Sequence, residues 1–386
     1  YKPVPMGDGQ SFALRLQASR TFRVYSLNFS EPWLGGKKPV RFNLSLSRTQ
    51  QFGASYSNSG RVEVNKDRGF SITGISAGLA KRVQWPDDFF TISHSLGYQL
   101  YEFNNYNIGL FNFGNGKSNS FAYTFGISRN ALSGGRIYPR GGSNFEITAK
   151  ITPPYSLFSN KDFKSITEES EALLEEISTL PQNDSRISEL NSQREKLEEE
   201  RFKWLEYYKL NFKGDWYTAL VGDLVLRTNA EFGFLGNYNQ DIGDVPFERF
   251  FVGGDGLGNF TLDGRDVIQL RGYENQSLTP RDPLTGQQEG GLVYNKFSME
   301  LRYPLTLKPS ASIYGLAFLE GGNAFNNFQE FNPFQIKRSA GLGLRIFMPA
   351  FGLLGIDFGY GFDQDYSPNS VGPSGWQTHF IIGQQF

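Results

Sequence analysis

The residues of this chain best suited to chemistry form the motif Arg271-Gly272-Tyr273-Glu274. The motif lies late in a long glycine-rich segment, between two stretches that alternate as strands do. An arginine in such a loop is ordinarily solvated. If the loop folds back into a barrel, the guanidinium requires a carboxylate partner, because an unpaired charge away from water is costly. We therefore expect Arg271 to hold the loop through an ion pair, with a solvated loop arginine as the alternative.

Little else in the sequence suggests catalysis or metal binding. Cysteine is absent, and the two histidines, His94 and His379, have no partner at metal-ligand spacing, so we interpret both as ordinary strand residues. The run Gly254-Asp-Gly-Leu-Gly258 lacks the strand-to-helix context and the lysine of a phosphate-binding loop. We predict that the protein is not an enzyme and binds no metal or cofactor.

The composition is typical of a barrel that crosses a membrane with strands. Phe (36), Tyr (19) and Gly (44) are abundant, whereas 38 basic and 39 acidic residues nearly cancel, so the charge gives no reason to expect a nucleic-acid partner. Mean hydropathy is negative at −0.41, and no apolar run is long enough for a transmembrane helix. Strands that face lipid on one side and a lumen on the other produce this combination, because the two faces cancel in a hydropathy window.

Alternation of apolar and polar residues predicts an all-β fold, a transmembrane antiparallel barrel with fourteen strands in this chain. In Phe297–Tyr303, apolar residues alternate with polar ones, and this pattern places Glu300 on the lumen face. An even strand number returns both chain ends to one side of the membrane. The predicted strands lie near residues 11–19, 21–31, 39–53, 69–83, 89–103, 118–130, 143–153, 206–218, 221–235, 293–306, 310–324, 335–347, 352–363 and 375–386.

Tight turns and longer connections are predicted to alternate between the two sides of the membrane. Short turns rich in Pro and Gly, expected on the periplasmic side, lie at residues 32–36, 85–88, 139–142 and 349–352. Longer connections, expected on the outer side, lie at residues 104–117, 154–205, 236–292, 325–334 and 364–374.

The segment 161–205 departs from the strand pattern and predicts a helical hairpin inserted in an outer loop. Ser165-Ile-Thr-Glu168 has the form of a capping box, and a turn at Pro181 separates two stretches with helical spacing of apolar residues. The hairpin is either a self-packed surface element or a docking surface for a partner, since an apolar stripe serves both purposes.

Four stretches, in order, make the chain resemble the BamA family of outer-membrane assembly barrels, in the form found in Bacteroidetes. They are Ser26–Gly35 with its Glu-Pro-Trp turn, Arg136–Ser143, Phe250–Gly254 followed by Leu270–Tyr273, and Phe380–Phe386. The resemblance covers the chain apart from the hairpin. Family members have sixteen strands preceded by periplasmic POTRA domains, and the Glu-Pro-Trp turn aligns this chain from the third strand. The resemblance thus implies that 1–386 is a C-terminal barrel domain, with POTRA domains and two strands upstream.

The resemblance also implies partners for the arginine. Residues 236–292 would be the sixth extracellular loop, which folds into the lumen, and Arg271 would meet carboxylates on the strands that follow. Glu320 takes the position of the family's carboxylate before glycine, and Glu300 is a second candidate. Alternation leaves the face of Glu320 open, because Phe318 shares its parity.

By the same resemblance, the protein would insert and fold client β-barrels in the outer membrane without nucleotide hydrolysis. Weak pairing of the first and last strands would open a lateral gate, whose edge templates a client strand. Phe380, Ile382 and Gly383 would line the last-strand side of this gate. Gly383 either loosens the seam or makes room for a lumenal neighbour. Phe386 would end the C-terminal assembly signal, although Gln384 replaces the usual apolar residue two positions earlier.

The expected partners are client outer-membrane barrel proteins, periplasmic or surface accessory lipoproteins, and the lipid bilayer. Three alternatives stay open. A translocase of the same superfamily, serving two-partner secretion or translocation and assembly, would differ in its upstream POTRA domains. A passive porin would conduct ions and would not need the Arg271 contact. A platform for surface lipoproteins bound at the hairpin would survive loss of gate motion.

Overall fold

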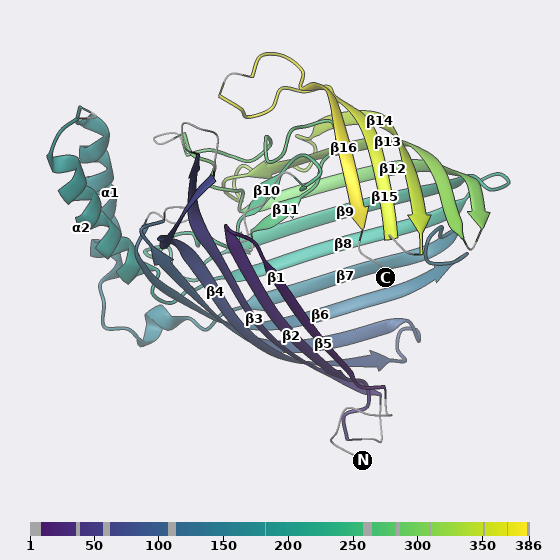
Figure 1. The fold of residues 1–386 in the computed structure, drawn as a ribbon, viewed down its shortest axis with the longest axis horizontal. Helices are drawn as coiled ribbons and strands as arrows, with labels where there is room; N and C mark the ends of the chain where they lie inside the picture. The colour runs from purple at the N-terminus through teal and green to yellow at the C-terminus, as the bar shows by residue number, and fades with distance from the viewer. Residues whose placement is uncertain are drawn as a thin grey trace.

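A computed structural model describes residues 9–35, 39–56, 62–106, 113–181, 183–257, 265–282, 286–308, 310–349, 352–368 and 370–383. Fourteen of its strands form one antiparallel sheet whose order follows the chain (Figure 1). They are β1 (Ser11–Ala18), β2 (Phe22–Glu31), β3 (Val40–Tyr56), β4 (Val62–Val83), β5 (Phe90–Asn104), β6 (Gly116–Ser133), β7 (Gly141–Ile151), β8 (Tyr208–Ala219), β9 (Val225–Gly236), β12 (Val293–Lys308), β13 (Ala311–Phe325), β14 (Lys337–Met348), β15 (Gly352–Gly361) and β16 (Gly375–Gly383).

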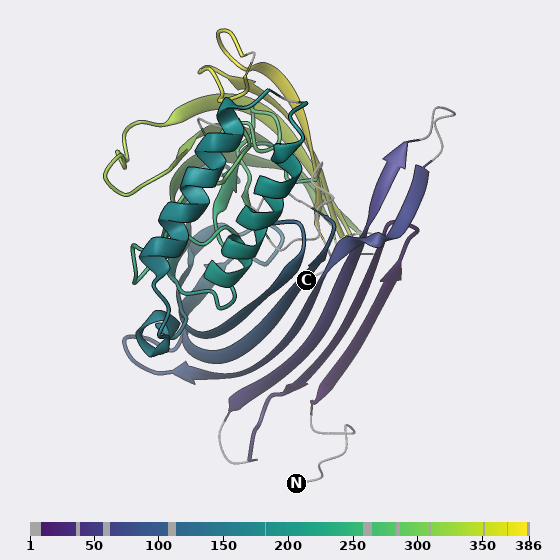
Figure 2. The same ribbon diagram turned by 90° about the vertical axis from the view of Figure 1, so that its left-hand side faces the viewer.

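The sheet curls around a central space, and its two ends are β1 and β16 (Figures 1 and 2). Within the described ranges, each of these two strands is paired along one edge only, β1 with β2 and β16 with β15. No helix in the same ranges is long and apolar enough to cross a membrane. The prediction of an all-β fold with fourteen antiparallel strands is confirmed.

Side chains alternate between the two faces of this wall, as the pleat requires. On β12, Met299 and Tyr303 are 49% and 55% exposed on the outer face, whereas Glu300 between them is only 3% exposed on the inner face. This alternation turns a sequence with negative mean hydropathy into an apolar outer surface around a polar interior.

The inner face changes character around the sheet. In the middle of β3 to β6 it carries neutral polar residues in register with one another, such as Ser45 opposite Ser76, and Gln99 opposite Ser120. The strands from β8 to β15 present charged side chains instead, and these are Lys209, Asp215, Arg227, Glu231, Lys296, Glu300, Arg302, Glu320, Arg345 and Asp357. The long segment between β9 and β12 is held against this charged half.

Two short strands within that segment were not predicted. β10 (Phe250–Val252) and β11 (Asp266–Ile268) pair in parallel, apart from the main sheet. They are only three residues long, too short for a period-two pattern to stand out in the sequence.

The helices α1 (Phe163–Thr179) and α2 (Arg186–Arg201) pack side by side outside one end of the sheet, after a 3₁₀ turn at Tyr155–Phe158 (Figure 2). The predicted capping box is wrong. The side chain of Asp162 accepts a hydrogen bond from the Ser165 amide at 3.2 Å, so Asp162 is the N-cap. An aspartate three residues before that amide satisfies it first, and the helix begins at Phe163.

Some strand ends also differ from the prediction. β4 begins at Val62 rather than near residue 69, because the β3–β4 hairpin continues beyond a bulge between Phe52 and Gly53. β7 begins at Gly141, inside the predicted turn 139–142. Residues 36, 350 and 351 of two predicted turns, and residues 384–386, lie outside the described ranges.

Candidate functional site

The segment that connects β9 and β12 is closed at a base, which is formed by the backbones of Gly254 and Leu270, and Arg271 comes directly after this base. The backbones of Gly254 and Leu270 exchange two hydrogen bonds of 3.0 Å each, next to the β10–β11 pair. The chain then projects the motif from this base toward the inner wall. Arg271 is 7% exposed and Tyr273 is fully buried, so the loop does not leave this arginine in solvent.

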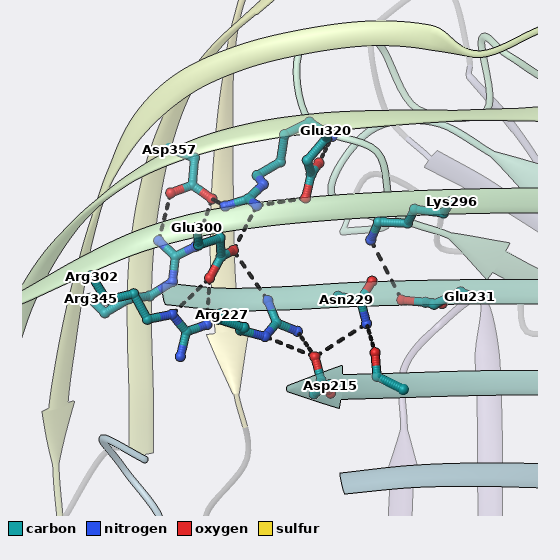
Figure 3. Close-up of polar contacts among 12 residues, drawn as sticks. Asp215, Arg227, Asn229, Glu231, Lys296, Glu300, Arg302, Glu320, Arg345 and Asp357 are labelled. Carbon is teal, nitrogen blue, oxygen red and sulfur yellow. Dashed lines mark hydrogen bonds and ion pairs between the residues drawn. The ribbon is translucent and has the colours of Figure 1, made fainter. Parts of the chain in front are cut away.

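Three carboxylates from three strands surround the Arg271 guanidinium. Its Nη2 lies 2.6 Å from Glu320 and 2.7 Å from Glu300, and its Nη1 lies 3.1 Å from Asp357. Glu320 also accepts the Arg271 backbone amide at 2.9 Å. Figure 3 shows Glu300, Glu320 and Asp357 converging from β12, β13 and β15. The structure thus brings Arg271 together with both predicted carboxylates and with a third.

Phe318 lies against the same guanidinium, and together with Glu300, Glu320 and Asp357 it forms what we call the Arg271 cage. The guanidinium carbon of Arg271 lies over the Phe318 ring, 3.8 Å from its centroid. Phe318 and Glu320 therefore both face inward, and the shared parity that left the face of Glu320 open in the sequence has a plain explanation. The aromatic ring covers the flat face of the cation while the carboxylates take its edge.

The cage belongs to a larger ion-pair network whose charges balance. The four arginines Arg227, Arg271, Arg302 and Arg345 and the four carboxylates Asp215, Glu300, Glu320 and Asp357 are linked by contacts of 2.5 to 3.2 Å. Burial raises the cost of each unpaired charge, and close pairing offsets that cost. Glutamates and arginines together keep the interior of this half polar but neutral.

The charge state of Arg271 is fixed by its partners. Burial by itself would lower the pKa of the Arg271 guanidinium, but the charges of Glu320 and Glu300 outweigh burial and raise that pKa above its ordinary value. Arg271 stays cationic at any pH a cell meets, so the contact does not depend on protonation of the guanidinium.

Gly272 places the loop backbone directly against the wall. Its φ is +84°, and a Cβ there would lie 2.8 Å from the Ser339 Cβ and 3.0 Å from the Gly361 nitrogen. The strand that faces Gly272 also carries a glycine at this point, because a Cβ on Gly359 would lie 2.8 Å from the Gly272 nitrogen. Side chains are excluded here by the approach of two backbones.

His379 holds the same backbone from the last strand. The Gly272 amide donates a hydrogen bond of 2.8 Å to His379 Nε2, and His379 is 4% exposed. His379 lies on strand β16, and the sequence held no local sign of its partner 107 residues away. His94, in contrast, lies on β5 with Nδ1 2.6 Å from the Tyr123 hydroxyl.

The remaining motif residues divide between the core and the surface. The Tyr273 hydroxyl donates to the Arg338 backbone oxygen at 2.7 Å. The Glu274 side chain is exposed, and its backbone oxygen accepts the Ser277 amide at 3.1 Å. Tyr273 thus secures the motif on β14, and Glu274 only shapes the turn that follows.

The same segment is also fastened to the opposite part of the charged wall. Glu248 lies 2.6 Å from Lys150 of β7 and 3.2 Å from Lys209 of β8, and Lys209 reaches Asp266 at 2.5 Å. Burial would raise the pKa of Glu248, but the charges of Lys150 and Lys209 outweigh burial and lower it below the ordinary value. No local pattern in the sequence predicted this anchor.

The helical hairpin contacts this segment as well. The Thr167 hydroxyl donates to the Asp241 backbone oxygen at 2.6 Å, and Arg201 Nε donates to the Ile242 backbone oxygen at 2.5 Å. Arg201 is held by buried Glu198 at 3.1 Å. One apolar cluster joins the two elements through Phe202, Leu205, Ile242, Val245 and Phe247. The hairpin is therefore packed against the loop as well as against itself.

The predicted gate residues on β16 show a clear alternation. Phe380 and Ile382 are 53% and 65% exposed on the outer face. Gly383 lies opposite Leu353 in the register, and a Cβ on Gly383 would meet the Leu353 Cβ at 3.2 Å. Phe386 lies outside the described residues.

Comparisons with known proteins agree with this architecture. Residues 6–386 match the Omp85 superfamily domain. Outer membrane protein assembly factor BamA of Nitratidesulfovibrio vulgaris is 32% identical over 172 residues, which are 44% of this chain and 19% of that protein.

Two solved structures match this chain at low sequence identity. CdiB from Escherichia coli matches with a TM-score of 0.51 and 13% identity, over 93% of this chain and 52% of that chain. CdiB from Acinetobacter baumannii gives a TM-score of 0.48 and 12% identity, over 93% and 49%. The chain spans about half the length of these structures and a smaller part of the BamA relative. Because the family match runs along nearly the whole sequence, this chain belongs to the Omp85 superfamily.

Proposed function

We propose that this chain is the barrel of a BamA-type assembly factor, which inserts and folds β-barrel proteins in the outer membrane without hydrolysing a nucleotide. The observation that carries the proposal is the Arg271 cage on the inner wall, with its contacts to Glu300, Glu320 and Asp357. An anchored loop inside such a wall suits a machine that works at its seam.

A strand edge exposed at the lateral gate would supply the driving force of the proposed reaction. A client strand arriving at a membrane has backbone groups without partners, and each costs several kcal/mol in hydrocarbon. An edge of the wall satisfies them by β-augmentation. The outer face of the sheet suits lipid, as on β1, where Phe12, Leu14 and Leu16 are 58% to 65% exposed. The lateral gate thus provides hydrogen bonds where water is absent.

The wider setting belongs to the same proposal. Client barrels, accessory lipoproteins and the outer-membrane lipid would be the partners, POTRA domains would lie upstream, and the source would be of the Bacteroidetes type. The BamA relative supports the assembly role over the part it matches. A two-partner-secretion or translocation-and-assembly translocase is the alternative, and a passive porin is disfavoured because the loop is fastened to two parts of the inner wall.

Depletion of the native protein and rescue with the full-length gene test this function. The rescuing gene would carry Arg271→Ala or Glu320→Ala, and Arg281→Ala serves as the matched control. Arg281 lies on the same loop, and its guanidinium donates hydrogen bonds to the backbone oxygens of Tyr366 and Gly286.

Collapse of many unrelated outer-membrane barrels, with the variant still present in the membrane and the control normal, would support a general insertase. Loss of one secreted passenger, with other barrels normal, would favour the translocase. Normal growth and normal barrels with Arg271→Ala would contradict the proposal.

A further inference from the structure

The last strand touches the loop at two successive residues. His379 accepts the Gly272 amide through Nε2 at 2.8 Å, and the Phe380 amide donates to Asp255 Oδ2 at 3.1 Å. His379 Nδ1 also lies 3.9 Å from the same Asp255 oxygen. His379 contributes its side chain and Phe380 contributes its backbone amide, so the loop holds β16 at two neighbouring points. We call this pair of contacts the clamp.

The Phe380 amide belongs to the open edge of the sheet. In an antiparallel strand the backbone N–H groups of successive residues point to opposite edges. β16 pairs with β15 on one side only within the described ranges, and the Phe380 amide is directed to Asp255. A further strand would accept hydrogen bonds from amides on this edge. The Asp255 carboxylate takes the place that a neighbouring strand's carbonyl oxygen would occupy.

Asp255 is held in place before it meets the strand. Its Oδ1 accepts the Leu257 amide at 2.9 Å, and Gln269 Nε2 donates to its backbone oxygen at 2.8 Å. The Asp255 side chain is 12% exposed. A carboxylate fixed in this way makes a charge-assisted bond, which is roughly twice as strong as one between neutral groups.

The clamp and the Arg271 anchor share one base. The Gly254–Leu270 exchange of hydrogen bonds fixes two neighbouring chain segments, and the residues that follow these two are Asp255 and Arg271. Arg271 pairs with carboxylates on β12, β13 and β15, whereas Asp255 accepts a hydrogen bond from β16. Movement of the base would shift both contacts together.

We propose that Asp255 is a latch that occupies the open edge of β16 at Phe380 and withholds this position from strand pairing while Arg271 anchors the loop. Asp255 is thus a positioning residue for the seam. The latch rests on the proposed function and deepens it, since it names the group that links the buried loop to the gate. Release of the loop would expose the Phe380 amide and make it available to an incoming strand.

Hydrogen exchange of the Phe380 amide tests the latch in the full-length protein held in lipid nanodiscs. Asp255→Ala should speed exchange of this amide about tenfold, the effect expected for loss of one charge-assisted hydrogen bond. Asp255→Asn keeps an acceptor oxygen and should retain most of the protection. Glu274→Ala is the matched control, because it removes the same charge from an exposed position on the same loop.

Coupling to the anchor has its own measurement. Arg271→Ala should speed Phe380 exchange as much as Asp255→Ala, and the double variant should add little, because both changes release the same contact. Folding of every variant is checked by heat-modifiable migration in gels, and Asp255→Ser replaces the alanine variant if the latter does not fold.

Unchanged Phe380 exchange in folded Asp255→Ala or Asp255→Ser would overturn the latch, and additive effects in the double variant would overturn the coupling. Neither measurement depends on client assembly. A barrel that assembles clients with an unprotected Phe380 amide would refute the latch alone, whereas a barrel that shows the latch but assembles no clients would refute only the proposed function.

Discussion

Arg271 and Phe318 form a stacked pair inside the wall, with the guanidinium carbon 3.8 Å from the ring centroid. The ring covers one flat face of the cation, and carboxylates from three strands take its edge. A planar, delocalised cation is required for both contacts at once, and the ammonium of lysine has neither the plane nor the fork of donors.

Replacement of Arg271 should therefore destabilise the loop in a graded way. Arg271→Ala leaves buried carboxylates short of a partner, a change that costs roughly 3–5 kcal/mol. Arg271→Lys should keep part of the ion pairing and lose the stacking and the second donor, so its cost should fall in between. Thermal unfolding of the full-length protein in detergent measures both. Equal stability of the lysine variant and the wild type would contradict the role of the planar cation.

Gly272 should tolerate no side chain. Gly272→Ala combines a φ of +84° with a Cβ placed 2.8 Å from the Ser339 Cβ and 3.0 Å from the Gly361 nitrogen. Gly372→Ala is the control, because Gly372 has a similar φ of +78° and nothing within 4 Å of a Cβ. The control should cost only the left-handed strain of about 1–2 kcal/mol. The same fall in unfolding temperature for both variants would show that the close approach at Gly272 is unimportant.

The Glu248 anchor should weaken in acid. The pKa of Glu248 is lowered below its ordinary 4.5, because the charges of Lys150 and Lys209 outweigh the effect of burial. A lowered pKa adds stability that is complete above the ordinary pKa and is lost as the pH falls from about 4.5 toward the folded-state pKa. Glu248 also accepts the Tyr207 hydroxyl at 2.9 Å, a bond that does not need its charge.

Protease cleavage of the segment 237–249, followed between pH 7 and pH 3, measures this dependence. Wild-type protein should become more susceptible below about pH 4.5. Glu248→Gln should be susceptible throughout and show a flatter profile, whereas Glu274→Gln, exposed on the same loop, should follow the wild type. Parallel profiles for the wild type and Glu248→Gln would refute the anchor.

The helical hairpin should stabilise the part of the loop around Ile242. Glu198→Gln with Arg201→Met removes the pair that reaches Ile242, and each amide near Ile242 should then exchange faster by about tenfold. Glu176→Gln with Arg186→Met removes the same charges from an exposed pair of 3.8 Å on the same hairpin and should leave those amides unchanged. Equal protection in the two double variants would show that the Glu198–Arg201 pair does not stabilise this part of the loop.

Much of the wall was predictable because its signal is local. Period-two alternation placed Glu300 on the inner face, and the family resemblance supplied Glu320. In the structure, both carboxylates contact Arg271. The same alternation put Asp357 on a consistent face, and a search of inward carboxylates on the later strands would have found it.

The contacts of the loop were not predictable in the same way. Glu248 meets Lys150 across 98 residues, and Gly272 meets His379 across 107. Periodicity in the sequence cannot predict contacts between residues so far apart, because these contacts depend on how an irregular segment folds against the inner face of the sheet. For Phe318 the alternation was correct, because it gave Phe318 and Glu320 the same face. The sequence did not show that the Phe318 ring stacks on the Arg271 guanidinium, which explains why an aromatic residue faces inward.

The two-sided fastening of the loop has a mechanical consequence. The segment between β9 and β12 ties β7 and β8 to β12, β13 and β15, so it acts as a strut across the charged half of the wall. On β5 the same segment makes an aromatic contact, Phe247 stacked on Tyr101 with ring centroids 4.2 Å apart, in place of the ion pairs found on β7 to β15. We therefore expect the barrel to be stiffer across its charged half, so that a change in its circumference occurs mainly in the half formed by the first strands and at the seam beside them.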